Sequence, residues 1–331
     1  MKKLSILVAI FLIGVLAVSC GSTEAKALKT GFASDTTIAD SISAAGSTNG
    51  EAAGYSKMVG VLVDEDGVIQ ACVIDAVQTK VEFSSAGKIV TPLTTTFDSK
   101  NILGDAYGMK AASSIGKEWN EQAKFLADYV VGKTVEDIKG IALNAEGAPT
   151  DEELTAGVTF HIAPYLDVLY KAVANATDLG AKQGDTLGLG TVTNIAQSAD
   201  FSAEGDGVAV LYSNYALASK NADGVITSAI IDASQAKVTF NAVGKLTVDV
   251  ATVFPTKDVI GNDYGMKAAS SIGKEWFEQA AAFATFATGK TIDEVKGVSM
   301  DAAGLVTDAE LATQVTIHVG DFIKALELAT K

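Results

Sequence analysis

The sequence is poor in the residues that build most metal and nucleic-acid sites. It has two cysteines and two histidines among 331 residues, and all 25 of its basic residues are lysines. So few cysteines and histidines exclude haem-attachment motifs, zinc knuckles and a cysteine-rich scaffold. The 40 acidic residues give a formal net charge of −15, whereas a nucleic-acid binder needs a cationic face that displaces counterions from phosphates. We therefore expect no nucleic-acid partner.

The first twenty residues have the pattern of a secretory signal. Lys2 and Lys3 precede an apolar run from Leu4 to Val18, which is shorter than the roughly twenty residues that a spanning helix needs. The ending Leu16-Ala-Val-Ser-Cys20 resembles a bacterial lipobox, in which the cysteine is acylated and the chain is cut before it. We predict a signal peptide over 1–19, a lipidated (palmitate-type) Cys20 with a polar leader over 20–29, and a lipid anchor on the extracellular face of the cell membrane. An uncleaved membrane anchor is the alternative.

The second cysteine, Cys72, lies in the apolar run Val68–Ile74. Because Cys20 is expected to carry lipid, no disulfide partner is left for it. A small buried side chain is the interpretation that we prefer to a reactive thiol.

An internal repeat is the strongest feature of the chain. A shift of 157 residues matches the chain to itself without a gap, and the thirteen residues Tyr107–Trp119 recur letter for letter as Tyr264–Trp276. A period this long indicates tandem domains, because the units of solenoids are far shorter. We predict repeat one over 30–172, a linker over 173–186 and repeat two over 187–331.

Each repeat is predicted to be α+β, with an antiparallel sheet followed by helices that pack on it. In repeat two, strands are expected over 191–201, 208–220 and 225–240, with a turn at Asn221–Gly224. In repeat one, apolar residues at three- and four-residue spacings predict a long helix over 105–131 that ends near Gly132. A hydroxyl followed by acids then predicts short helices that begin at Thr134 and Thr291.

Motifs for hydrolysis and nucleotide binding are weak. Gly132-Lys-Thr134 imitates the end of a phosphate loop, but Ala127 and Ala284 stand where the motif needs glycine. A helix stop followed by a helix cap is the interpretation that we favour. No nucleophile-elbow sequence accompanies the serines and histidines, and the acids at Asp64–Asp66 lack the further spaced oxygen ligands of a calcium site.

The two histidines lie one repeat apart, each two residues after a threonine, in Thr159-Phe-His161 and Thr316-Ile-His318. In an extended segment the threonine and the histidine share one face, whereas in a first helical turn they diverge. The polar face of an edge strand is one interpretation. The other is a threonine hydroxyl and an imidazole displayed at a helix start, where a phosphate is favoured electrostatically.

Together these features resemble the flavin-carrying lipoproteins of Gram-positive extracellular electron transfer, of the pheromone-encoding type with tandem FMN-binding-like domains. The resemblance covers essentially the whole mature chain. It rests on the Tyr-Gly-Met-Lys…Gly-Lys-Glu-Trp segment, the Gly-Lys-Thr stop, and the segments 153–159 and 310–316. In that family a magnesium-dependent flavin transferase joins FMN to a threonine through a phosphoester.

The resemblance implies acceptors at Thr159 and Thr316, within a motif that usually reads Asp-x-x-Ser/Thr-Gly-Ala-Thr. Here Glu153 and Glu310 replace the aspartate of the motif, and Val158 and Val315 replace its alanine. Repeat two also has Gln314 where repeat one has Gly157. A glycine at this position would let the backbone approach the phosphate, which makes Thr316 the less typical site. The remaining predicted flavin-binding residues are His161, His318, Tyr107, Met109, Tyr264 and Met266, whereas helix packing is favoured for Trp119 and Trp276.

The sequence-based hypothesis is thus a lipid-anchored flavoprotein with covalent FMN on each repeat. It would relay electrons from a membrane quinol-linked donor to extracellular acceptors, as a carrier rather than as a turnover enzyme. The alternative is a non-redox surface binding or structural lipoprotein that uses the same fold without flavin.

Overall fold

The computed structural model describes residues 25–331, so the predicted signal peptide and the lipidated Cys20 lie outside the described residues. Within residues 25–331, none of the helices is long and apolar enough to cross a membrane.

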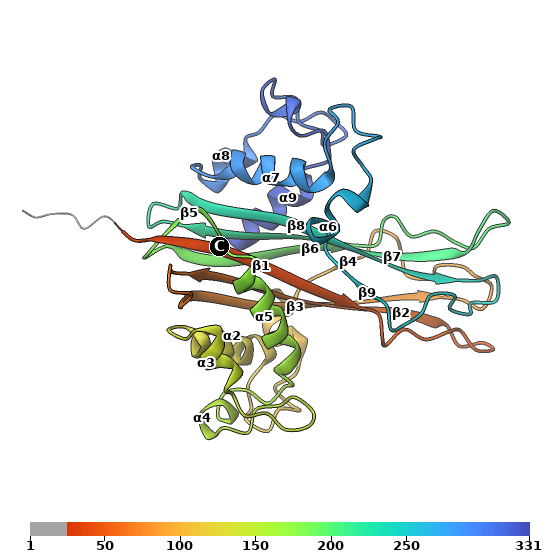
Figure 1. Cartoon of the computed structure of the whole chain (residues 1–331). Helices are drawn as coiled ribbons and strands as arrows, with labels where there is room; N and C mark the ends of the chain where they lie inside the picture. Colours follow the sequence, from red (N-terminus) through yellow and green to blue (C-terminus); the bar gives the residue numbers. More distant parts are fainter. Residues whose placement is uncertain (1–24) are drawn as a thin grey trace, which may run out of the picture.

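Two antiparallel sheets form the centre of the molecule (Figure 1). The first has the order β3-β2-β1-β5 and consists of β1 (Ala27–Thr37), β2 (Gly50–Val63), β3 (Ile69–Phe83) and β5 (Thr177–Lys182). The second has the order β4-β6-β7-β8 and consists of β4 (Thr96–Phe97), β6 (Thr186–Asn194), β7 (Gly207–Lys220) and β8 (Ile226–Phe240). The short β9 (Val253–Phe254) pairs with β1.

Helices cover the outer face of each sheet, on opposite sides of the molecule (Figure 1). Repeat one supplies α1 (Lys100–Leu103), the 3₁₀ turn η1 (Gly104–Tyr107), α2 (Trp119–Val130), α3 (Val135–Lys139), α4 (Glu152–Thr155) and α5 (Ala163–Ala174). Repeat two supplies α6 (Lys257–Ile260), η2 (Gly261–Tyr264), α7 (Trp276–Ala287), α8 (Ile292–Lys296), η3 (Leu311–Thr313) and α9 (Gly320–Ala329). The predicted α+β class, with helices packed on antiparallel sheets, is confirmed.

The two sheets pack face to face, so the repeats share a core. Phe83 and Phe240, one repeat apart, stack with ring centroids 4.2 Å apart and planes at 2°. Each repeat also lends a two-residue strand to the other, because β4 pairs with β6 and β9 pairs with β1. Long strands that are buried on both faces explain why β2 and β7 are apolar or small almost throughout.

The long helix predicted over 105–131 is wrong in its first half. The helix α2 begins only at Trp119, where Glu118 and Glu121 form a capping box. Gly108 and Gly116 adopt left-handed φ values of 77° and 63°, which break a helix. Apolar residues in the irregular segment 108–118 therefore occur at helical spacing without forming a helix.

The turn predicted at Asn221–Gly224 and the helices predicted to begin at Thr134 and Thr291 agree with the structure, and repeat one has the same turn. Gly67 and Gly224 have φ values of 77° in the turns that join β2 to β3 and β7 to β8. Thr134 and Thr291 cap α3 and α8 with capping boxes, directly after the end of the preceding helix. The Gly-Lys-Thr segments thus act as helix stop and helix cap, the interpretation preferred above.

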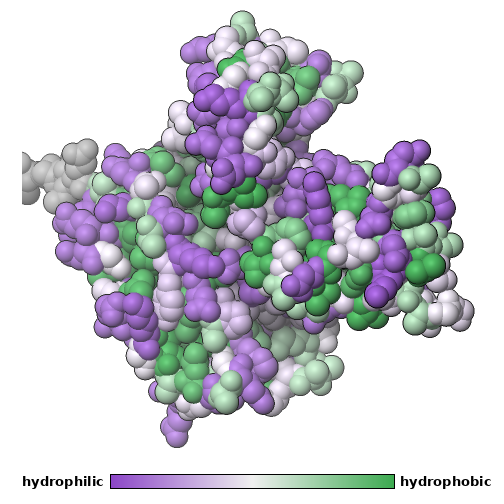
Figure 2. Space-filling view, turned by 45° about the vertical axis from the view of Figure 1, so that its right-hand side comes forward, coloured by the Kyte–Doolittle hydropathy of each residue, from purple (hydrophilic) through white to green (hydrophobic). Residues whose placement is uncertain are grey.

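The segment predicted as a linker, 173–186, contains the end of α5 and all of β5, which pairs with β1. Within residues 25–331, Cys72 has no disulfide partner; it packs half-buried against the core of repeat one, and burial raises the pKa of its thiol. Figure 2 shows one face of the molecule, where hydrophilic side chains cover much of the projecting helical lobe and hydrophobic ones gather near its junction with the sheets.

Candidate functional site

The two candidate threonines occupy the same environment in the two repeats. The Thr159 N–H and Oγ–H both donate to Oε1 of Gln122 on α2, at 2.8 and 3.1 Å. The Thr316 N–H and Oγ–H donate to Oε1 of Gln279 on α7, at the same two distances. Both glutamines are fully buried, whereas both threonines are half-buried. Each hydroxyl is therefore held at a fixed place on a residue that is partly exposed.

Hydrogen bonds from the first turn of each helix hold the loop that faces the threonine. The Gln122 amide nitrogen donates to Ser113 Oγ and to the Lys117 carbonyl. The buried Glu118 accepts the backbone N–H groups of Met109 and Lys110, at 2.8 and 3.0 Å. Repeat two reproduces this arrangement with Gln279, Ser270, Lys274, Glu275, Met266 and Lys267. Met109 and Met266 thus belong to the loop that Gln122 or Gln279 links to the threonine.

The glycine two residues before Thr159 has a packing reason. A Cβ on Gly157 would come within 2.3 Å of the Phe125 ring, which covers this backbone. Repeat two has Gln314 and Ala282 at the two equivalent positions, so glutamine is accommodated where the ring is missing. The structure therefore supplies a reason for Gly157 that does not involve a phosphate, and the change to Gln314 does not by itself argue against a site at Thr316.

A lysine reaches the same corner in both repeats. Lys117 Nζ lies 5.3 Å from the centre of the Phe125 ring, and Lys274 Nζ lies 3.4 Å from Oε1 of Gln314. Lys117 is therefore close to the contact between Phe125 and Gly157, and Lys274 is close to Gln314, the equivalent of Gly157. These contacts place Lys117 and Lys274 beside the segments that precede Thr159 and Thr316.

The histidines lie outside this arrangement. His161 and His318 are exposed, and His161 Nε2 is 3.9 Å from a carboxylate oxygen of Glu146. Residues 158–162 form neither a regular strand nor the first turn of α5, which begins at Ala163. The threonine hydroxyl points to the buried glutamine, while the histidine side chain is in solvent. The predicted pairing of hydroxyl and imidazole is not formed.

Tyr107 and Tyr264 take part in a cluster that the sequence did not predict. Lys100 is 4% exposed, and its Nζ lies 4.8, 4.4 and 5.0 Å from the ring centres of Tyr55, Tyr107 and Trp119. The equivalent Lys257 is also 4% exposed, and its Nζ lies 4.5, 4.7 and 4.6 Å from the ring centres of Tyr212, Tyr264 and Trp276. Each lysine also donates to a tyrosine hydroxyl, at 3.1 Å to Tyr55 and 2.7 Å to Tyr212. We call these clusters the lysine cages.

A buried aspartate accompanies each lysine cage. Burial lowers the pKa of Lys100 to about 8 and that of Lys257 to about 7, against the opposing attraction of Asp75 and Asp232. Burial also raises the pKa of Asp75 to about 6 and that of Asp232 to about 7. Removal of a charged group from water disfavours its charged form. The cages therefore hold four groups that change charge near neutral pH.

The sequence contains a pattern that could have pointed to the lysine cages. Lys100, Tyr107 and Trp119 recur as Lys257, Tyr264 and Trp276 at unchanged spacing. A lysine in an irregular stretch is usually solvated, so the sequence alone gives it no role. In the cages, Tyr107 and Tyr264 each present a ring face to the lysine, so that face is unavailable to a flavin ring. Trp119 and Trp276 are buried in the cores, in agreement with the predicted packing role.

The residues around each threonine suit a phosphoester. Esterification of Thr159 Oγ would replace the proton donated to Gln122, while the backbone N–H would keep the segment in place. Lys117 or Lys274 would balance the phosphate charge. The buried glutamine links the loop that contains Met109 or Met266 to the threonine. In the part of the chain that the structure describes, no cluster of three or more histidine, cysteine, aspartate or glutamate side chains is arranged to hold a metal ion.

Comparisons with known proteins add one partial similarity. No protein-family model and no solved structure matches the chain. Over 88 residues the chain is 34% identical to a chlorophenol reductase of Desulfitobacterium hafniense. The match covers 24% of this chain and 27% of the relative, so the chain spans about a quarter of that protein's length. The name of that protein describes a reduction.

Proposed function

We propose that the protein is an electron carrier with FMN bound covalently to Thr159 and Thr316. The observation that carries the proposal is the repeated anchor, in which a buried glutamine fixes the N–H and the hydroxyl of the threonine at matching distances. Both threonines are also partly exposed, as a residue that is to be modified must be. The partial similarity to a reductase supports a redox role.

Loading requires an activated flavin donor. A flavin transferase with magnesium would bring a flavin dinucleotide to the half-open hydroxyl. The threonine oxygen would form a bond to the phosphorus of the FMN half, the pyrophosphate bond would break, and AMP would leave with the proton released from the hydroxyl. Gln122 or Gln279 would hold the acceptor oxygen in position, since its Oε1 already binds the hydroxyl.

When bound, FMN would supply reversible one- and two-electron transfer. The protein would hold two such groups on one rigid pair of sheets. We further propose that lipid on Cys20 anchors the chain to the extracellular face of the cell membrane. The carrier would then take electrons from a membrane quinol-linked donor and pass them to extracellular acceptors. A covalent bond keeps the cofactor from being lost outside the cell.

Intact mass tests the proposal. The protein is made with and without a flavin transferase, and we expect two FMN-sized additions in the wild type, one in Thr159→Ala or Thr316→Ala, and none in the double variant. Thr155→Ala is the matched control, because Thr155 is exposed in the same segment and donates only to the Glu152 carbonyl. It should leave both additions unchanged. Unmodified protein from the native host would overturn the proposal.

A non-redox surface lipoprotein is the second candidate. It is favoured by the internal hydrogen bonds that already satisfy both threonine hydroxyls. In that case the protein from its native host would be colourless at the flavin absorption bands, and Thr159→Ala with Thr316→Ala would lower stability without changing a redox property.

A further inference from the structure

Strands β1 and β8 of the two facing sheets contact each other along a row of hydroxyl groups. Thr30 on β1 hydrogen-bonds Ser228 on β8 at 2.7 Å, and Thr36 hydrogen-bonds Ser234 at 3.1 Å. Both pairs are 198 residues apart. The two strands therefore run side by side with a constant offset, which places Phe32 opposite Ile230 and Ser34 opposite Asp232.

The row is interrupted at Ser34. Its side chain is 6% exposed, and among the described residues 25–331 its Oγ has no hydrogen-bond partner. Asp232 is also buried, and its Oδ1 accepts the N–H groups of Ala233 and Asp258 at 2.7 and 3.0 Å. A buried hydroxyl without a partner costs about 1–3 kcal/mol. The strands thus keep an unsatisfied polar group at this one step of the row.

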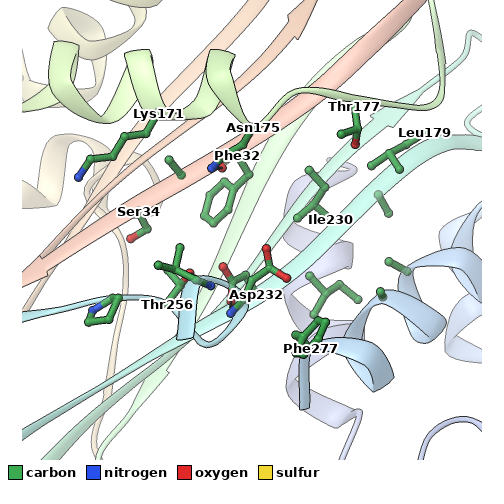
Figure 3. Close-up of a pocket in the computed structure, with 18 of the residues that line it drawn as sticks. Phe32, Ser34, Lys171, Asn175, Thr177, Leu179, Ile230, Asp232, Thr256 and Phe277 are labelled. Carbon is green, nitrogen blue, oxygen red and sulfur yellow. Dashed lines mark hydrogen bonds between the residues drawn. The ribbon is translucent and has the colours of Figure 1, made fainter. Parts of the chain in front are cut away.

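A pocket of about 840 Å³ opens at this step (Figure 3). Ser34 and Asp232 both line it, together with ring and aliphatic side chains such as Phe32 and Ile230 from the strands and Phe277 from α7. The volume is in the range of sites for small molecules, which are mainly apolar with a few convergent polar groups. The pocket differs from the threonine sites, because neither Thr159 nor Thr316 lines it.

The charges of the pocket define its ligand further. Among the described residues that line the pocket, Lys171 is the one cation, and both oxygens of Asp35 bind it, at 2.6 and 2.7 Å. Lys257, which attracts Asp232, lies outside this lining, and Asp258 has no cation within it. An anionic ligand would therefore be repelled. Because burial raises the pKa of Asp232 to about 7, its carboxyl can both donate and accept hydrogen bonds at neutral pH.

We propose that this pocket binds a neutral aromatic alcohol, such as a phenol or a hydroquinone, with its ring among Phe32, Ile230 and Phe277 and its hydroxyl at Ser34 and Asp232. An acyl chain would place methylene groups against the unsatisfied Ser34 hydroxyl, so a lipid tail suits the pocket poorly. The inference does not depend on flavin at the threonines.

The related contact between the sheets, in which the repeats exchange roles, places the hydroxyl differently. The positions equivalent to Ser34 and Asp232 are Thr191 and Asp75, and Thr191 Oγ donates to the Met58 sulfur at 3.2 Å. The hydroxyl is thus satisfied inside the protein. Ser34 thus differs from its counterpart Thr191, although Ser99 Oγ and Asn120 Oδ1 at the related step are, like Ser34 Oγ, buried without a hydrogen-bond partner among the described residues.

Isothermal titration calorimetry with 1-naphthol on the full chain tests the proposal. We expect saturable one-to-one binding of 1-naphthol, with 1-methoxynaphthalene, 1-naphthoate and 1-decanol at least tenfold weaker. The ether cannot donate to Asp232, the carboxylate is repelled, and decanol has no ring. Ser34→Ala should weaken 1-naphthol binding about tenfold, the cost of one good hydrogen bond.

Two further variants make the test independent of folding. Ala281→Trp, at an exposed lining position on α7, should weaken 1-naphthol binding at least tenfold, because the added ring occupies part of the lining one helical turn after Phe277. Lys124→Trp, at the equivalent exposed position on α2, should leave binding unchanged. Ser34→Ala should melt no lower than the wild type, because it removes an unsatisfied buried hydroxyl. Absence of 1-naphthol binding, equal binding of 1-decanol, or binding that Ala281→Trp leaves unchanged would each overturn the proposal.

Discussion

The ring of Phe125 lies directly on the backbone of Gly157, so close that a Cβ on this glycine would meet three ring atoms within 2.3 Å. Gly157→Ala should therefore destabilise the protein by about 1–3 kcal/mol, the usual cost of overpacking. Phe125→Ala should remove most of that penalty, because the space beneath the ring is then open. Urea denaturation of the two single variants and the double variant gives the coupling energy.

The equivalent position in repeat two supplies the control for this pair. Gln314→Ala should change stability by less than about 1 kcal/mol, since Gln314 is exposed and faces Ala282 rather than a ring. Additive losses from Gly157→Ala and Phe125→Ala would show that the ring does not explain the glycine.

Gln122 and Gln279, which hold the two threonines, should have matched effects on stability when they are replaced. Gln122→Met and Gln279→Met should each cost about 1–3 kcal/mol, because each leaves a half-buried threonine N–H and hydroxyl without their acceptor. Hydrogen exchange of the Thr159 and Thr316 amides is the direct measurement. Only the amide of the altered repeat should exchange faster, whereas faster exchange at both threonines would point to general unfolding.

The lysine cages predict how stability depends on pH. Stability rises with pH wherever the unfolded chain binds more protons than the folded one. Burial lowers the pKa of Lys257 to about 7 from 10.5, so its contribution to the free energy of unfolding should increase as pH rises from about 7 to 10. Burial raises the pKa of Asp232 to about 7 from 3.8, so its contribution should fall as pH rises from about 4 to 7.

Together, Lys257 and Asp232 should contribute least to the free energy of unfolding near pH 7. Urea denaturation across pH 4–10 measures this dependence. Lys257→Met should remove the rise on the alkaline side by about 1 kcal/mol or more, since one pKa unit corresponds to about 1.4 kcal/mol. Asp232→Asn should flatten the acidic side. Lys245→Met, at an exposed position, should reproduce the wild-type curve, and a Lys257→Met curve parallel to the wild type would contradict a buried, neutral lysine.

The sequence predicted the repeat, the hairpins and the α+β class because these depend on local patterns that the duplication shows twice. It placed the start of α2 too early because Ala111, Ala112 and Ile115 mimic helical spacing, while the left-handed backbone at Gly108 and Gly116 is set by the fold. The lysine cages and the Ser34 pocket were not predicted. They join residues from distant strands, such as Ser34 and Asp232, and only the pairing of the two sheets brings these together.

The shared core between the sheets predicts that the repeats unfold as one unit. Each repeat has one tryptophan, Trp119 or Trp276, so Trp276→Phe and Trp119→Phe variants let fluorescence report on each repeat separately. Because Phe83 and Phe240 stack across the interface, both reporters should show the same urea midpoint. Phe83→Ala, in repeat one, should cost about 3–5 kcal/mol and lower both midpoints equally.

Val243→Ala, at a side chain that is 63% exposed, is the control and should shift neither midpoint by more than about 0.5 kcal/mol. Two separate transitions, or a Phe83→Ala effect seen only through Trp119, would mean that the sheets pack as independent domains. A single transition whose midpoint shifts equally for both reporters would instead show one cooperative core. In that core, β2, β3, β7 and β8 pack one face against the helices and the other face against the sheet of the other repeat.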